Sequence, residues 1–204
     1  MTTRRYTQRA RAASAEETRE RILDAMRAAL RSAPREPLSV EKVAQAAGVA
    51  RSTVYLVFGS RAGLFDALGQ DLLERTGFRR IVAAVALPDA RDAVRESLRA
   101  SASVYAAERD VARAVYSMWW LEPEAVRGVF EVLERGRAEG QRTLAERLAG
   151  EGHLRPDVTV DEATDILWMV TSFDAFDQLY RGRSLSEAEV ADRLIAVAER
   201  TLWT

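Results

Sequence analysis

The 204-residue sequence has no cysteine and one histidine. The lack of cysteine excludes disulfide bonds and thiolate metal sites. The single histidine, His153, lies in a glycine-rich turn without an acid–base partner or a metal ligand at a suitable spacing, so we expect a surface loop residue there. We therefore predict no bound metal and no cofactor.

Signatures of catalysis are missing as well. The sequence contains no GxxxxGK[ST] phosphate loop, no GxGxxG turn and no GxSxG elbow. Carboxylates are abundant, but in a chain with 30% charged residues we expect most of them on solvated faces. We therefore predict that the chain is not an enzyme.

Long hydrophobic runs are absent. The run Ile81–Leu87 falls far below the ~20 apolar residues that a membrane-spanning helix needs. Residues 1–17 are polar and basic and lack the apolar segment of a signal peptide. These features predict a soluble cytoplasmic protein with no membrane partner.

The formal net charge of −1 conceals an uneven distribution. Residues 1–60 carry eleven basic and six acidic side chains, whereas residues 61–204 carry nineteen and twenty-five. A basic first third followed by an acidic remainder is typical of a DNA-binding domain joined to a domain that does not touch DNA. Ordinary solubility charge also produces splits of this size.

The stretch Ser39–Phe58, SVEKVAQAAGVARSTVYLVF, has the pattern of two short helices joined by a tight turn. Ser39 is suited to cap the first helix, whose apolar residues recur at helical spacing. Gly48 stands where the chain must turn, because glycine adopts a positive φ at little cost. Val49 and Val54 can pack back against the first helix. The pattern fits a helix-turn-helix, whose second helix enters the DNA major groove, and it also fits an ordinary helical hairpin.

The flanking sequence favours the helix-turn-helix. TRERILDAMRAAL predicts a preceding helix, and Ser60 is placed to cap a following helix in AGLFDALGQDLLER. From TRERIL through AGVARSTVYLVFGSRAGLF, over residues 16–75, the sequence resembles the DNA-binding domain of the tetracycline-repressor (TetR) family. The resemblance implies an all-α protein, with an N-terminal three-helix helix-turn-helix domain and a C-terminal helical bundle that binds a ligand and dimerises.

The resemblance also implies a function and a set of DNA-binding residues. It implies a sequence-specific transcriptional regulator on a near-palindromic double-stranded DNA operator, by default a repressor, with activation left open. By resemblance, Tyr55, Arg61 and Ser39 contact phosphate. Arg51 has the reach and fork geometry to bind guanine, Thr53 suits a thymine methyl or a phosphate, and Ser52 suits a phosphate.

Two features depart from the family pattern. The link between the first two helices is Arg31–Pro37, whose two prolines should end the first helix sharply, instead of a Phe-rich, Gly-containing segment. Ala50 stands where many members have a capping serine or threonine, so we expect the recognition helix to lack a cap worth ~1 kcal/mol.

The sequence divides into three parts. Residues 1–15 hold Arg4, Arg5, Arg9 and Arg11 and predict a flexible basic arm, which either lies along DNA or has no role. Residues 16–75 form the DNA-binding domain, and residues 76–204 form the ligand-sensing and dimerising domain. In the latter we expect helices after Pro88-Asp89, over 111–121, from Pro123 to Gly150 but interrupted or weakened at Gly136 and Gly140, over Asp161–Tyr180, and from Ser186 to near Trp203.

The final two of these helices are apolar over more than one stripe, which is wider than packing on a single core requires. This width predicts a homodimer held by a four-helix interface, as the TetR resemblance also implies, and a charge at Leu194 or Ile195 should then dissociate it. The alternative is that both helices are central in their own domain. Their apolar residues are Ile166, Leu167, Met169, Val170, Phe173, Phe176, Val190, Ala191, Leu194, Ile195, Val197, Ala198 and Leu202.

Aromatic residues gather in the C-terminal part and define a candidate pocket. An apolar pocket suits a small hydrophobic or aromatic effector better than a sugar or a nucleotide. Each aromatic residue singly also suits a helical core. Asp174 and Asp177, one helical turn apart, either face water, pair with arginines across the dimer or attract a cationic ligand. The candidate pocket residues are Tyr116, Trp119, Trp120, Phe130, Trp168 and Phe173.

These observations predict a DNA-binding transcriptional regulator that is released from its operator by a small hydrophobic or aromatic effector. The alternative from another class is an all-helical enzyme or binding module that retains the N-terminal unit. A DNA-binding test separates the two, as does a turnover assay on a bound metabolite.

Overall fold

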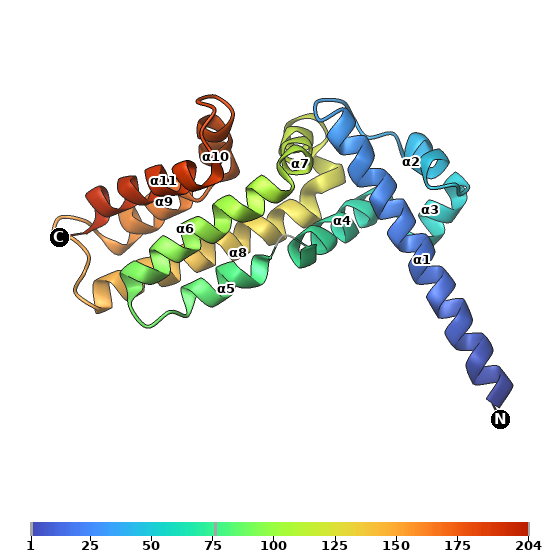
Figure 1. Cartoon of the computed structure of the whole chain (residues 1–204), viewed down its shortest axis with the longest axis horizontal. Coiled ribbons are helices and arrows are strands. Elements are labelled where there is room, and N and C mark those ends of the chain that lie inside the picture. The colour runs from blue at the N-terminus through green and yellow to red at the C-terminus, as the bar shows by residue number, and fades with distance from the viewer. Residues whose placement is uncertain (1, 76, 204) are drawn as a thin grey trace. The chain divides into compact units, whose positions relative to one another are not determined.

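The computed structural model describes the backbone of residues 2–75 and 77–203, and the side chains of residues 13–75 and 77–203. Over these residues the chain forms eleven helices and a single isolated bridge between Leu154 and Trp203, without any strand (Figure 1). The predicted all-α fold is therefore confirmed. Among the described helices, none combines the length and the apolar character that crossing a bilayer demands.

The chain folds into two compact units. The first comprises Met1–Gln70 and Arg113–Val129, and the second comprises Asp71–Ala112 and Phe130–Thr204. The sequence predicts one boundary near residue 75; in the structure a short segment after residue 112 also groups with the N-terminal helices.

The first unit contains α1 (Thr2–Ser32), α2 (Val40–Ala46), α3 (Arg51–Phe58) and most of α4 (Arg61–Arg75). It also holds most of α7 (Arg109–Leu121) and the start of α8 (Pro123–Gly150). The predicted apolar faces of the first four helices form its core. Their buried residues include Ile22, Leu23, Met26, Leu30, Val43, Val54, Leu64, Phe65 and Leu68.

The first helix is longer than predicted. Its backbone is helical from Thr2, so residues 2–15, predicted as a flexible arm, continue α1. The four arginines of this arm lie outside the part of the chain whose side chains the structure describes. At its other end α1 stops at Ser32, just before Pro34, as the two prolines of the link predict.

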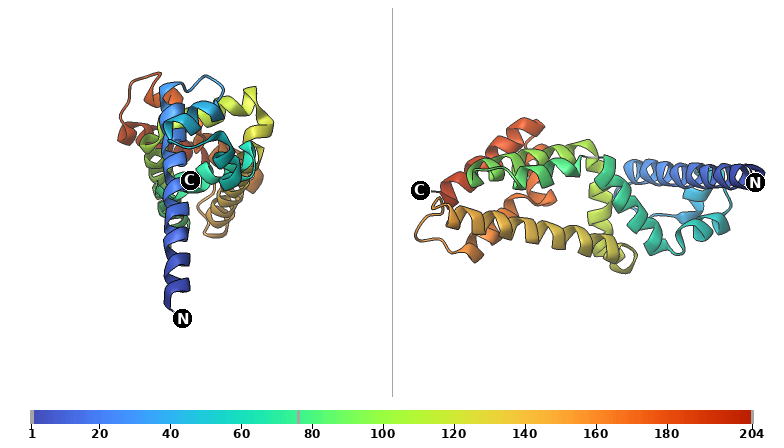
Figure 2. Two further views of the ribbon diagram at one scale, coloured as in Figure 1. Left: turned by 90° about the vertical axis from the view of Figure 1, so that its right-hand side faces the viewer. Right: turned by 90° about the horizontal axis from the view of Figure 1, so that it is seen from below.

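The second unit is built from α5 (Phe78–Val85), α6 (Ala90–Ala107), the greater part of α8, α9 (Val160–Val170), α10 (Phe173–Tyr180) and α11 (Glu187–Leu202). The short α5 packs along α6, and α11 packs against α6 and α9 (Figures 1 and 2). Their buried residues include Val94, Leu98, Leu144, Leu148, Leu167, Phe173, Phe176, Val190 and Leu202.

The prediction of one continuous helix near residue 170 is wrong, and of the two alternatives left open at the glycines of α8 the structure excludes the interruption. The expected helix Asp161–Tyr180 is two helices, because α9 ends at Val170 and the hydroxyl of Ser172 accepts a hydrogen bond from the N–H of Ala175 to begin α10. Conversely, α8 runs unbroken through Gly136 and Gly140. The capped start of α10 outweighs the apolar pattern across it, whereas isolated glycines only weaken a helix.

The two aspartates of α10 have different surroundings. Asp174 is exposed, whereas Asp177 is 8% exposed. Asp177 Oδ1 lies 2.5 Å from Arg109 Nε, and their side chains are 10% and 14% exposed. The hydrogen bond to Asp177 raises the pKa of the Arg109 guanidinium. Asp177 thus pairs with an arginine of its own chain, whereas the sequence analysis considered arginines across the dimer.

Removing one partner of this shielded pair should destabilise the protein. In Asp177→Ala the Arg109 guanidinium stays mostly buried with only Asp110 beside it, so we expect the free energy of unfolding to fall by about 2–4 kcal/mol. Urea denaturation measures this change. Asp174→Ala, at an exposed position one turn away, should cost less than about 1 kcal/mol. Equal losses in the two variants would contradict the account.

Candidate DNA-binding surface

The turn between α2 and α3 is set by a few local interactions. The hydroxyl of Ser39 accepts a hydrogen bond from the N–H of Lys42 at 3.3 Å, which caps α2 as predicted. Gly48 has φ 66°, a left-handed conformation that favours glycine. Beyond it, the N–H of Val49 donates to the carbonyl of Ala44 at 3.0 Å and closes the end of α2. The DNA contact predicted for Ser39 stays a prediction beside this capping role.

The helix α3 is held by one side and open on the other. Val54 is 1% exposed, and α3 packs against α2. Arg51 and Ser52 at the start of the helix are exposed, while Thr53 is half-buried. Ala50 supplies no side-chain cap, as predicted. The N-terminal residues of α3 are thus available to a ligand, which is where a recognition helix meets base edges.

Arg51 and Tyr55 act together on this helix. Arg51 Nη2 lies 3.4 Å from the Tyr55 hydroxyl oxygen, and the guanidinium carbon is 5.6 Å from the centre of the Tyr55 ring. The hydrogen bond with Tyr55 raises the pKa of Arg51, so the guanidinium stays charged. The ring therefore supports a cationic fork at the start of α3, in the geometry suited to guanine or phosphate.

Leu56 is a surface residue that the sequence analysis does not identify. Its side chain is 85% exposed although it lies one residue from Tyr55 in the middle of α3. A large apolar side chain on the open side of a recognition helix suits the C5-methyl group of thymine. The sequence could have indicated this exposure, because residue 56 of the helix points roughly away from the side that carries Val54.

Arg61, expected to contact phosphate, is engaged within the protein. Its Nη2 lies 2.7 Å from Glu122 Oε2, and the two side chains are 32% and 30% exposed. Glu122 lies between α7 and α8, in the segment that groups with the N-terminal helices. A phosphate and the Glu122 carboxylate would therefore compete for the same guanidinium. Sequence reasoning missed Glu122 because the two residues are far apart along the chain.

The predicted pocket residues differ widely in exposure. Tyr116 and Trp119 are half-buried and Trp120 is 83% exposed; all three belong to the first unit. In the second unit Phe130 is half-buried, Trp168 is 44% exposed and Phe173 is fully buried. The ring of Trp168 lies 4.5 Å from the guanidinium carbon of Arg137, and Phe173 packs edge-on against Tyr105. Their joint role in a ligand pocket stays a prediction.

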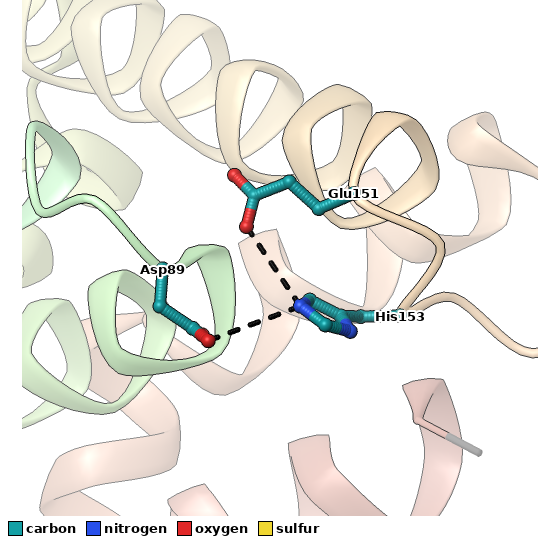
Figure 3. Close-up of side chains that lie close together, drawn as sticks. All are labelled: Asp89, Glu151 and His153. Atoms are coloured by element: carbon teal, nitrogen blue, oxygen red, sulfur yellow. Dashed lines mark ion pairs between the residues drawn. The ribbon is translucent and has the colours of Figure 1, made fainter.

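His153 is not the isolated residue that the sequence predicts (Figure 3). Its Nε2 lies 3.9 Å from Asp89 Oδ2 and 3.8 Å from Glu151 Oε2. Glu151 also accepts a hydrogen bond from the N–H of Ala90 at 2.7 Å. These contacts join the end of α8 to the start of α6.

Each carboxylate of this cluster already has an arginine as its ion-pair partner. A hydrogen bond with Arg91 lowers the pKa of Asp89 to about 2, and Asp89 also caps α6. The N–H of Ala90 lowers the pKa of Glu151, which also pairs with Arg147 at 2.9 Å. The three ligand atoms lie within 4.8 Å of one another, a spacing that a metal ion tolerates. Because two arginines balance their charge, the arrangement fits a clasp between helix ends better than a cation site.

One family model matches the N-terminal part of the chain. The model for bacterial regulatory proteins of the tetR family matches residues 22–68, which run from α1 into α4. This part of the chain, which includes the whole helix-turn-helix, is therefore similar to the DNA-binding region of TetR-family regulators. Comparison with curated proteins gives no match.

Solved structures share the fold at low identity. NalD of Pseudomonas aeruginosa, described as the secondary repressor of the MexAB-OprM multidrug efflux pump, is 23% identical, with a TM-score of 0.69 over 92% of this chain and 97% of NalD. A putative fatty acid metabolism regulator of Clostridium perfringens is 15% identical, with a TM-score of 0.70 over 88% and 97%. The ketosteroid transcriptional regulator KstR2 of Mycobacterium tuberculosis is 17% identical, with a TM-score of 0.65 over 91% and 95%.

The exposed side chains of α3 should determine which DNA sequence the protein prefers. We expect Arg51→Ala to weaken binding to the preferred operator by roughly ten- to a hundredfold while leaving non-specific DNA nearly unaffected. Leu56→Ala should relax the preference for thymine at one position with a smaller loss, and it should leave folding intact because the side chain is exposed. Competition binding on operator and scrambled duplexes measures both. Unchanged selectivity in both variants would rule out base reading by this side of α3.

The Arg61–Glu122 pair makes a second prediction. Glu122→Gln should release Arg61 and raise affinity for all DNA about three- to tenfold, with the salt dependence steeper by about one counterion. Glu124→Gln is the matched control, since Glu124 is 81% exposed and pairs with Arg127 in its own helix. Binding titrations at several salt concentrations make the measurement. An equal effect of the two variants would show that only overall charge matters.

Proposed function

We propose that the chain is a dimeric repressor that binds a near-palindromic operator through α3 and is released by a small hydrophobic or aromatic effector. The observation that carries this proposal is the open, cationic start of α3 within a TetR-family helix-turn-helix. The basic balance of residues 1–60 supports it, since phosphate attraction supplies much of the affinity for DNA. The acidic balance of the remaining residues is consistent with a domain that does not contact DNA.

The lipophilic character of the effector has separate support. Proteins of this fold include one named for fatty acid metabolism and one named for ketosteroids, both lipophilic compounds. The second unit of this chain has an aromatic and aliphatic interior, which suits such ligands. The mechanism we infer is a population shift, in which the effector favours a conformation of the dimer that no longer fits both half-sites.

The proposed release is testable with the chain's own tryptophans. An effector bound near Trp119, Trp120 or Trp168 should change tryptophan fluorescence at the same concentration that releases a labelled operator. Alanine substitution of these residues should weaken the response about tenfold or more where the residue contacts the ligand. Screening lipophilic and polar compounds in parallel makes the test. Release by polar compounds alone, with a full response in all three variants, would contradict the proposal.

The two residues chosen from the sequence to test the dimer interface are buried within the single chain. Leu194 and Ile195 are 8% and 6% exposed within a single chain, so a charge there would unfold the chain as well as divide a dimer. The apolar residues that remain outside on these helices are Trp168 and Met169 on α9 and Val197 on α11. Met169 is 57% exposed and Val197 is 44% exposed. We propose that this face is the dimer interface.

Met169→Glu should dissociate the dimer without unfolding the chain, because the new charge would be buried only in the assembly. Val132→Glu is the matched control, since Val132 is 67% exposed but lies on α8, outside the proposed interface. Sedimentation equilibrium at micromolar concentration measures the molecular mass of each variant. A monomeric wild-type chain, or dissociation caused equally by the control, would contradict this interface.

A further inference from the structure

Two helices of the first unit touch at a glycine. Gly69 lies in the middle of α4, is buried, and faces Val129 near the start of α8. A Cβ placed on Gly69 would lie 2.0 Å from Val129 Cγ2 and 3.2 Å from Val129 Cβ, whereas ordinary carbon contacts begin at 3.4 Å. A methyl group of the valine therefore fills the space that any side chain at position 69 would need.

A second close contact lies next to the first. A Cβ on Gly128 of α8 would lie 2.6 Å from Asp66 Oδ1 of α4. Asp66 and Gly69 are one helical turn apart on α4, and Gly128 and Val129 are adjacent on α8, so the two contacts mark the place where the helices cross. The carboxylate of Asp66 is the end of a side chain and can turn away, whereas Val129 meets the backbone of α4 directly.

The helix α4 is also fixed to the rest of the first unit. Leu64, Phe65 and Leu68 are at most 1% exposed and belong to the core that α4 shares with the helix-turn-helix. At the first residue of α4, Arg61 pairs with Glu122, which directly precedes α8. The start of α8 thus contacts α4 at its first residue and again at Gly69, while the other side of α4 holds the helix-turn-helix.

The glycine contact lies where both helices leave the first unit. This unit ends at Gln70 within α4 and at Val129 within α8. Gly69 and Val129 are therefore among the last residues of the unit on their helices. Their contact sets the separation from which α4 and α8 continue along the chain.

A side chain at position 69 could not be accommodated by turning Val129. Valine has one strongly preferred χ1 rotamer in a helix, and Val129 is only 7% exposed. Rotation would also leave its Cβ at 3.2 Å, which is still too close. The backbones would have to separate, and moving Cγ2 from 2.0 Å to 3.4 Å takes a displacement of at least about 1.4 Å.

We propose that Gly69 and Val129 are positioning residues for DNA recognition, and that their contact sets the half-site spacing that the dimer accepts. The inference rests on the proposed function, because it presumes a dimer on an inverted repeat. Each protomer places its α3 in one half-site, so a displacement where α4 leaves the first unit enters twice. Twice about 1.4 Å is comparable with the rise of one base pair, about 3.4 Å.

Gly69→Ala tests the proposal on DNA. The operator is first obtained by selection from random duplexes, and inverted repeats are then made with centre-to-centre spacings that differ by one base pair. We expect the variant to bind a single half-site within about twofold of the wild type, since α3 is unchanged. It should bind the wild-type optimum repeat about tenfold more weakly, or prefer a spacing that differs by one base pair.

A second substitution and a control separate spacing from a packing defect. Gly69→Ala combined with Val129→Ala removes Cγ2 and leaves the 3.2 Å Cβ contact, which needs a shift of a few tenths of an ångström, so it should restore the wild-type optimum. Gly140→Ala on α8 is the matched control, because a Cβ there meets no described atom within 4 Å. Equal loss on the half-site and on the repeat would show a packing defect and overturn the proposal. So would a wild-type spacing profile in Gly69→Ala.

Val129→Ala tests the same contact without a clash and is decisive if Gly69→Ala does not fold, as thermal unfolding shows. Loss of the valine methyl groups frees the crossing, so neighbouring spacings should be bound within about threefold of the optimum. A profile as sharp as that of the wild type would overturn the proposal.

The wild-type profile distinguishes this inference from the proposed function. If the wild type binds an inverted repeat no more tightly than a single half-site, dimeric operator binding fails and this inference fails with it. If the wild type shows a sharp optimum that Gly69→Ala and Val129→Ala both retain, operator binding stands and only the role of the glycine contact fails. Fluorescence anisotropy of labelled duplexes measures all of these affinities.

Discussion

The structure of the DNA-binding surface depends on how one short helix is held. The eight-residue helix α3 has no side-chain cap at its start, and an isolated helix of this length is unstable in water. Burial of Val54 and the left-handed turn at Gly48 keep α3 against α2, so that all its remaining stability comes from tertiary packing. The other side of α3 is not needed for packing, and Arg51, Tyr55 and Leu56 lie there.

The segment after residue 112 connects this surface with the rest of the chain. It groups with the N-terminal helices, it carries Trp119 and Trp120, and its Glu122 neutralises Arg61. The Arg61–Glu122 pair therefore joins this segment to the helices that carry the DNA-binding surface.

How far the sequence predicted this structure depends on the range of the interactions. The helix-turn-helix, the cap at Ser39, the missing cap at Ala50 and the start of α8 at Pro123 all follow from residues close together in sequence, and the structure confirms them. The division of the expected helix Asp161–Tyr180 was missed because a capping serine competes with a continuous apolar pattern. The pairs Arg61–Glu122 and Arg109–Asp177, and the neighbours of His153, join distant residues. One sequence shows that such side chains exist but not which of them meet.

The central claim is that α3 reads a specific DNA sequence as part of a symmetric dimer. Selection of bound duplexes from a random library by the full chain tests it most directly, because it assumes no operator and no effector. The account predicts enrichment of an inverted repeat whose half-sites lie about one helical turn apart, or a multiple of it, from centre to centre. Enrichment of no sequence, or of a single site without an inverted repeat, would contradict it.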